Sequence, residues 1–128
     1  MLDEVIERDL IENAASMGAH LKQGLMDLQR EIPIVGDVRG LGLLCAVEVV
    51  SDQQTKAPLP LGAMAADRIR RIGQRHGLMI YTRRTNGGRL GEWFMVSPPL
   101  IVTKEQVDDI IQRLKATLQE FNREIRPY

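Results

Sequence analysis

Three arginines lie close together in one short polar segment, and their residue type suits the binding of a carboxylate. The segment holds Arg83, Arg84 and Arg89 among threonine, asparagine and glycine residues. A guanidinium group binds a carboxylate through two parallel hydrogen bonds, which makes arginine the usual residue for carboxylate recognition. A basic loop is more often simply solvated, so residue type and spacing alone favour solvated arginines, and a carboxylate-binding site is the alternative.

The lysines are the next candidates for chemistry, because a lysine can form a Schiff base with a carbonyl compound. That reaction needs a lysine whose pKa is lowered by burial or by a neighbouring cation. Three of the four lysines lie in polar parts of expected helices, and the other lies in an expected loop. We therefore predict that none is catalytic and that all four are solvated: Lys22, Lys56, Lys104 and Lys115.

Histidine, cysteine and glycine patterns give no catalytic, metal or phosphate site. His20 and His76 lie among polar helical residues, with no serine, cysteine or metal-ligating partner at a suggestive spacing. Cys45 lies in an apolar run, where a cysteine usually behaves as a small hydrophobic residue. The Gly-Leu-Gly at 40–42 is too short for a phosphate-binding fingerprint and predicts a bend between strands.

Composition limits the function classes that remain. The chain has 128 residues, of which 44% are hydrophobic, and it carries 17 basic and 17 acidic residues. Zero net charge argues against nucleic acid or an anionic membrane as the main partner. No apolar run approaches the roughly 18 residues of a membrane-spanning helix. A single cysteine excludes an internal disulfide and favours a reducing, cytoplasmic location.

Apolar residues recur at intervals of three or four over three stretches, which predicts three helices. The first covers about residues 3–30, with an apolar stripe from Ile6 to Leu28. The second covers 61–76 and ends before a glycine. The last begins after Thr103, where Thr-Lys-Glu-Gln forms a capping box that is typical of a helix start.

Short apolar segments between these helices predict the strands. Residues 35–50 read as two strands, and the run 43–50 is apolar enough to suit a strand covered on both faces. Residues 78–82 and 93–96 read as a second pair, with a turn at Asn-Gly between them. The order α-β-β-α-β-β-α predicts one α+β domain over 1–128, an antiparallel sheet of three to four strands with helices packed on it.

Several segments, taken in order, resemble the class III aminotransferases. The resemblance runs over nearly the whole chain and is carried by 9–14 (DLIENA), 17–21 (MGAHL), 35–43 (VGDVRGLGL), 46–48 (AVE), 77–80 (GLMI) and 97–103 (SPPLIVT). It implies the small C-terminal domain of a fold-type-I enzyme that uses pyridoxal phosphate (PLP). Such enzymes transfer an amino group from an amino acid or amine to a 2-oxo acid, and work as homodimers.

The resemblance also implies what residues 1–128 lack. In the family the large domain, which precedes this one, carries the PLP-binding lysine and most phosphate contacts. We therefore expect an excised fragment, or a gene product that starts at an internal methionine. PLP would belong to the full-length enzyme, and the isolated chain is expected to bind no PLP and to be inactive. The small domain of the family helps close the site over the amino substrate.

Many members of the family carry a substrate-carboxylate arginine directly after the Gly-Leu-apolar-apolar strand. Here Tyr81 occupies that position, and Arg83 and Arg84 follow. Strand residues alternate between faces, so Tyr81 and Arg83 share a face if the strand continues through 83. Arg83 is then the first candidate for carboxylate binding and Arg84 the second. If the chain turns at Thr82, the two cannot be ranked, and the alternative is that both are solvated.

A second class of function remains open, a free-standing α+β domain that binds a ligand or another protein without catalysis. Such a domain needs a self-sufficient surface. The aminotransferase interpretation instead expects an apolar face that the missing large domain would cover. We expect the first helix, with its stripe from Ile6 to Leu28, to pack on that domain or on another copy of the chain.

Overall fold

The computed structural model describes residues 1–126 and confirms the predicted α+β class and element order. Four antiparallel strands form one sheet in the order β1-β2-β4-β3. The elements are α1 (Leu2–Glu7), α2 (Leu10–Glu31), β1 (Val35–Leu41), β2 (Leu44–Val49), η1 (Leu61–Ala63), α3 (Ala65–Arg75), β3 (Tyr81–Arg84), η2 (Thr85–Gly88), β4 (Glu92–Val96) and α4 (Lys104–Ile125).

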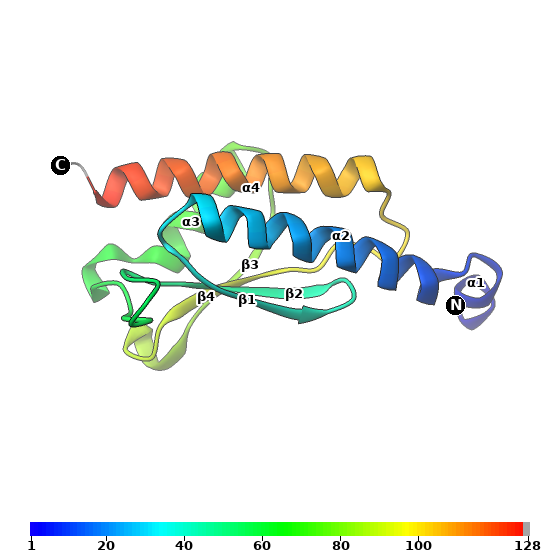
Figure 1. Cartoon of the computed structure of the whole chain (residues 1–128), viewed down its shortest axis with the longest axis horizontal. Helices are drawn as coiled ribbons and strands as arrows, with labels where there is room; N and C mark the ends of the chain where they lie inside the picture. The colour runs from blue at the N-terminus through cyan, green and yellow to red at the C-terminus, as the bar shows by residue number, and fades with distance from the viewer. Residues whose placement is uncertain (127–128) are drawn as a thin grey trace.

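The long helices cover one face of the sheet. Figure 1 shows α2, α3 and α4 on the same side of the strands, with α2 and α4 side by side and running in the same direction. Core side chains come from alternate positions of β2 and β4 and from the facing helices, among them Val47, Val49, Phe94, Leu21, Leu25, Leu114 and Phe121. Within residues 1–126, no helix combines the length and apolar character needed to span a bilayer.

The prediction that the strand within 43–50 is covered on both faces is wrong for this chain. The burial of β2 alternates: Cys45, Val47 and Val49 are buried, whereas Leu44 is 57% exposed. Successive side chains of a strand point to opposite faces, and the helices cover only one of them. We call the uncovered side, which includes alternate residues of all four strands, the open face.

The first helix also differs from its prediction. It is interrupted after Glu7, because Asp9 adopts a left-handed backbone with φ of 48°. Ile6 lies on the short helix α1 and is 65% exposed, so it does not join the stripe. From Leu10 to Leu28 the stripe packs on β1 and α4 of the same chain. The stripe is therefore used within the chain, and packing of this helix on a large domain or on another copy stays a prediction.

Two boundaries are displaced around the second helix. Met64 has a left-handed backbone, so the α-helix begins at Ala65 rather than at Leu61. Gly77 ends the helix as predicted, with φ of 74°. The amide of Leu78 then donates to the carbonyl of Gly73 at 2.8 Å, a contact of the Schellman type. Since this cap uses residues 77 and 78, β3 begins at Tyr81 rather than near Leu78.

The last helix confirms its predicted start. The amide of Gln106 donates to the hydroxyl of Thr103 at 3.3 Å, and the Gln106 side chain accepts from the Thr103 amide at 3.0 Å. Both halves of the capping box are present. Val107, Leu114 and Phe121 are fully buried along the predicted stripe.

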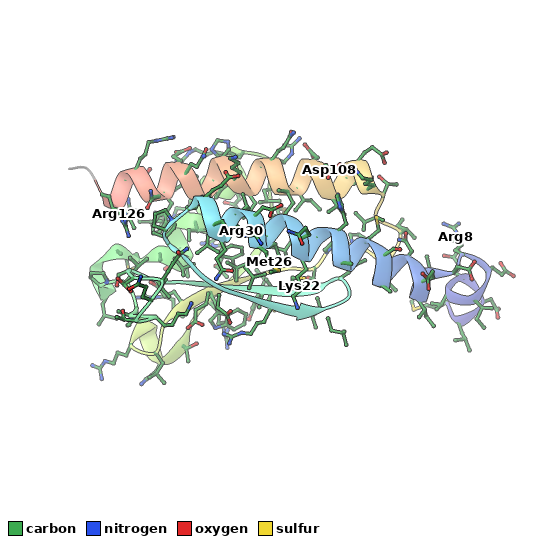
Figure 2. All side chains as sticks on the ribbon, viewed as in Figure 1. Arg8, Lys22, Met26, Arg30, Asp108 and Arg126 are labelled. Atoms are coloured by element: carbon green, nitrogen blue, oxygen red, sulfur yellow. The ribbon has the colours of Figure 1, made fainter. Side chains whose placement is uncertain are left out.

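The helix α2 touches the turn between β1 and β2 through backbone atoms. A β-carbon placed on Gly18 would lie 2.2 Å from the carbonyl carbon of Gly42, far inside contact distance. Gly42 has φ of 56°, which favours glycine in the turn itself. Lys22, one helical turn further along, donates to the carbonyl of Gly40 at 3.2 Å and lies between α2 and this hairpin (Figure 2). Two glycines thus set how closely α2 approaches the sheet.

Replacing Gly18 by alanine is expected to destabilise the fold by about 1–3 kcal/mol, because the added methyl group overpacks a backbone contact. Urea unfolding of the chain measures the loss. Gly62→Ala is the matched control, because a β-carbon at Gly62 meets nothing within 4 Å. Equal stability of the two variants would contradict the close approach.

Two histidine–carboxylate contacts join α4 to the other helices. His20 of α2 contacts Asp108 at 2.6 Å, and His76, just after α3, contacts Glu120 at 2.7 Å. Arg75 first, and His76 second, hold the pKa of Glu120 below its usual value. His20, followed by Lys104, does the same for the pKa of Asp108.

Glu120→Gln is expected to lower Tm at neutral pH, because it removes the carboxylate that pairs with α3. The folded pKa of Glu120 lies below its ordinary value of 4.5, so the stabilisation is complete above that value and is lost as pH falls through the lowered pKa. Thermal unfolding across pH should show the difference between variant and native chain shrinking in acid. Glu7→Gln, on exposed α1, serves as the control, and a pH-independent difference would contradict the assignment.

Candidate functional site

The ladder between β3 and β4 sorts the predicted arginines onto two faces. Arg83 lies opposite Trp93, and Arg84 lies opposite Glu92. Along β3 the side chains alternate, with Tyr81 and Arg83 exposed and Arg84 half-buried. The strand therefore continues through residue 83, and Tyr81 and Arg83 share the open face.

Arg84 points into the structure and is held by a buried carboxylate. Glu92 is 3% exposed, and its oxygens accept from the backbone amides of Ala65 and Ala66 at 3.1 and 3.2 Å. These amides form the N-terminus of α3, where the helix dipole favours a negative charge. The Nε atom of Arg84 lies 3.0 Å from a Glu92 oxygen. The charge of Arg84 is therefore balanced inside the protein.

Arg83 is placed differently from the other two arginines. Its side chain is exposed on the open face, and within residues 1–126 no ion pair or hydrogen bond engages its guanidinium. Arg89 lies beyond the predicted turn, in which Asn86 and Gly87 have φ of 49° and 64°. It borders a separate hollow with Lys56. The structure thus does not bring the three arginines together.

The rest of the open face explains why the charge of Arg83 stands out. The other cation of the open face is Arg39 of β1. Its guanidinium nitrogens lie 3.3 Å from a carboxylate oxygen of Asp37 and 3.1 Å from one of Glu48. Glu48 lies opposite Trp93 in the β2–β4 ladder. Among the described residues, Arg83 is the one cation of the open face that has no carboxylate partner.

Aromatic and apolar side chains surround Arg83, and sequence reasoning missed them. The Tyr81 and Trp93 rings lie 6.2 Å apart between centroids, tilted by 54°. The indole N–H of Trp93 donates to the Thr85 hydroxyl at 3.0 Å. Met95 lies directly opposite Tyr81. The β3–β4 register, had it been known, would have placed these residues together.

A hollow of about 270 Å³ begins at Tyr81 and Met95. It runs between the segments before β3 and after β4. Most of its other lining residues have apolar side chains, although backbone groups make part of the wall polar: Leu78, Met79, Ile80, Val96, Pro98, Pro99 and Ile110, with Ser97. The two prolines cannot donate backbone hydrogen bonds, so the ladder stops before them. The strands part there, and the hollow opens between them.

The described residues do not fit a PLP site. Lys22 and Lys56 donate to the carbonyls of Gly40 and Gly36. The other two lysines pair with carboxylates on the surface, Lys104 with Asp108 and Lys115 with Glu31. No lysine of residues 1–126 lies in the apolar shelter that a Schiff-base lysine needs.

No other reactive centre is apparent in the part of the chain that the structure describes. Cys45 is buried in β2 as predicted, and burial raises the pKa of its thiol. A raised pKa leaves the thiol protonated and poorly nucleophilic. Residues 1–126 contain no group of three or more histidine, cysteine or acidic side chains that could hold a metal ion.

Comparison with known protein families decides the relationship. The family model "Aminotransferase class-III" matches residues 1–118. The chain belongs to the class III aminotransferases. The resemblance noted in the sequence is thereby confirmed.

Curated relatives are aminotransferases of greater length. An uncharacterized aminotransferase of Schizosaccharomyces pombe is 34% identical over 116 residues, covering 89% of this chain and 25% of its own. The mitochondrial alanine–glyoxylate aminotransferase 2 homolog 2 of Arabidopsis thaliana is 35% identical, covering 91% and 23%. The taurine–pyruvate aminotransferase of Bilophila wadsworthia is 34% identical, covering 84% and 24%. The class III chain thus spans about a quarter of these relatives.

Solved transaminase structures share the fold. An (S)-enantioselective omega-transaminase of Thermomicrobium roseum superposes with a TM-score of 0.81 at 32% identity, covering 94% of this chain and 25% of its own. A transaminase of the marine bacterium Virgibacillus superposes with a TM-score of 0.89 at 26% identity, covering 94% and 27%. An amine transaminase of an uncultivated Pseudomonas species, solved in its PLP-bound form, has a TM-score of 0.80 at 34% identity, covering 93% and 25%.

The two arginines of β3 are expected to differ in what they contribute to stability. Arg84→Ala leaves the buried Glu92 without its cation and should lower the free energy of unfolding by about 1–3 kcal/mol. Arg83→Ala removes an exposed side chain and should change it by less than about 0.5 kcal/mol. Urea unfolding of both variants checks this, and a reversed order would contradict the assignment of faces.

Proposed function

We propose that this chain is the C-terminal domain of a PLP-dependent class III aminotransferase of fold type I. The complete enzyme transfers an amino group from an amino acid or amine to a 2-oxo acid. This domain helps to close the substrate site, and Arg83 binds the substrate carboxylate. The observation that supports this role is the charge of Arg83, exposed on the open face without a carboxylate partner among residues 1–126.

The cofactor belongs, on this proposal, to a large domain outside residues 1–128. PLP supplies the electron sink that lets an amino group leave a carbon atom. The surface positions of the four lysines support a role for this chain on the substrate side alone, with Arg83 fixing the orientation of the substrate. The isolated chain is therefore proposed to be inactive. Arg84 stays a weaker candidate, because Glu92 already engages it.

The assembly and location of the enzyme are part of the proposal. The resemblance to the family supports a homodimer. The single buried Cys45 fits a reducing compartment, which supports the cytoplasm. The alternative of a free-standing interaction domain is less well supported, because the open face leaves Leu41 90% exposed and Leu44 57% exposed.

Arg83→Ala in the complete enzyme is expected to lower kcat/KM for amino acid substrates about ten- to a hundredfold. This corresponds to a lost hydrogen bond to a charged group, about 1.5–3 kcal/mol. Activity toward amines that lack a carboxylate should be unchanged, and so should PLP binding. Steady-state kinetics with matched amino acid and amine substrates measures the difference.

Arg71→Ala is the matched control, since Arg71 is exposed on α3 and away from the open face. If Arg83→Ala lowers activity toward the amine as much as toward the amino acid, Arg83 does not recognise the carboxylate. If it lowers neither, the arginine has no role in substrate binding.

A further inference from the structure

The open face carries an apolar surface next to its unpaired charge. Tyr81 and Met95 lie opposite each other across β3 and β4, one ladder position from Arg83 on the same face. Tyr81 is 54% exposed on this face. The hollow of about 270 Å³ opens directly from these two residues. Arg83 thus lies one ladder position from two residues that line the hollow.

The spacing suits one small molecule that contacts both features. Residues two apart on a strand are separated by about 7 Å along it. An amino acid with an aromatic or branched side chain spans a comparable length from its carboxylate to the end of that side chain. The recess is slightly smaller than the roughly 300 Å³ at which sites for whole ligands begin. Its volume of about 270 Å³ leaves room for an aromatic or branched side chain.

The surrounding charges disfavour a second acidic group on the ligand. Arg39 is already engaged by Asp37 and Glu48. Glu48 lies opposite Trp93, pairs with Arg39, and borders the separate hollow that contains Lys56 and Arg89. The wall of the hollow contains no basic side chain. A carboxylate on the side chain of a substrate would lose water here without gaining a cation, which is unfavourable.

We propose that Tyr81 and Met95 determine the specificity of the enzyme for amino acids and 2-oxo acids with an aromatic or branched apolar side chain. The side chain lies over Tyr81 and Met95 and enters the hollow between β3 and β4, while Arg83 binds the carboxylate. This inference rests on the proposed function. It goes beyond it by naming the substrate class and the residues that select it.

The test compares substrates in the complete enzyme. The native enzyme is expected to prefer phenylalanine and leucine over alanine, and to discriminate against aspartate and glutamate. Tyr81→Ala should lower kcat/KM for phenylalanine about tenfold or more, mainly through KM, and leave alanine nearly unchanged. Met95→Ala should act in the same direction. Tyr81→Phe keeps the aromatic ring, so this variant should retain the native preference for phenylalanine over alanine.

Leu90→Ala is the matched control, because Leu90 is a large apolar residue, 68% exposed, that lies outside this hollow. The inference would be overturned if Tyr81→Ala and Met95→Ala lowered kcat/KM equally for phenylalanine and alanine. It would also be overturned if the native enzyme preferred substrates with acidic side chains. The two proposals fail separately. If Tyr81→Ala lowers kcat/KM for phenylalanine alone while Arg83→Ala leaves kcat/KM unchanged, the apolar subsite is supported. Only the proposal that Arg83 binds the carboxylate is then wrong.

Discussion

The buried carboxylate of Glu92 is the interaction on which the arrangement of β3, β4 and α3 depends. A buried charge is tolerated only where it is paired and hydrogen-bonded. Here the N-terminus of α3 supplies two amides and β3 supplies Arg84. Three elements are thereby fixed to one another at a single point. Once Arg84 points inward to meet Glu92, the alternation of the strand directs Arg83 outward.

The open face follows from that constraint together with the position of the helices. The helices α2, α3 and α4 all lie on one side of the sheet (Figure 1). Strand residues whose side chains point to the same face as Arg83 are therefore left uncovered by these helices. The register of β3 with β4 then places Trp93 and Met95 beside Arg83 and Tyr81. A structural ion pair on the covered face therefore determines which polar and aromatic groups are available on the uncovered one.

Local signals in the sequence predict much of this fold. The capping box at Thr103, the stop at Gly77 and the Asn-Gly turn depend on neighbouring residues, and the structure contains all three. Contacts between distant segments were not predictable in the same way. The burial of Glu92 requires α3 to lie beside β4, and the proximity of Tyr81 to Trp93 requires the strand register. The break at Asp9 was missed because the apolar spacing continues through it.

The sheet order leaves β1 and β3 as edge strands, each paired to another strand on one side only among the described residues. Exposed edges invite pairing with other chains, and proteins discourage it with short strands, charged residues and bulges. The strand β3 has four residues, two of them arginines, and the register of β1 shifts between Val35 and Asp37. Arg83 therefore has a second consequence for the chain. Its charge also opposes intermolecular strand addition, so the side chain to which we assign ligand recognition also contributes to the solubility of the chain.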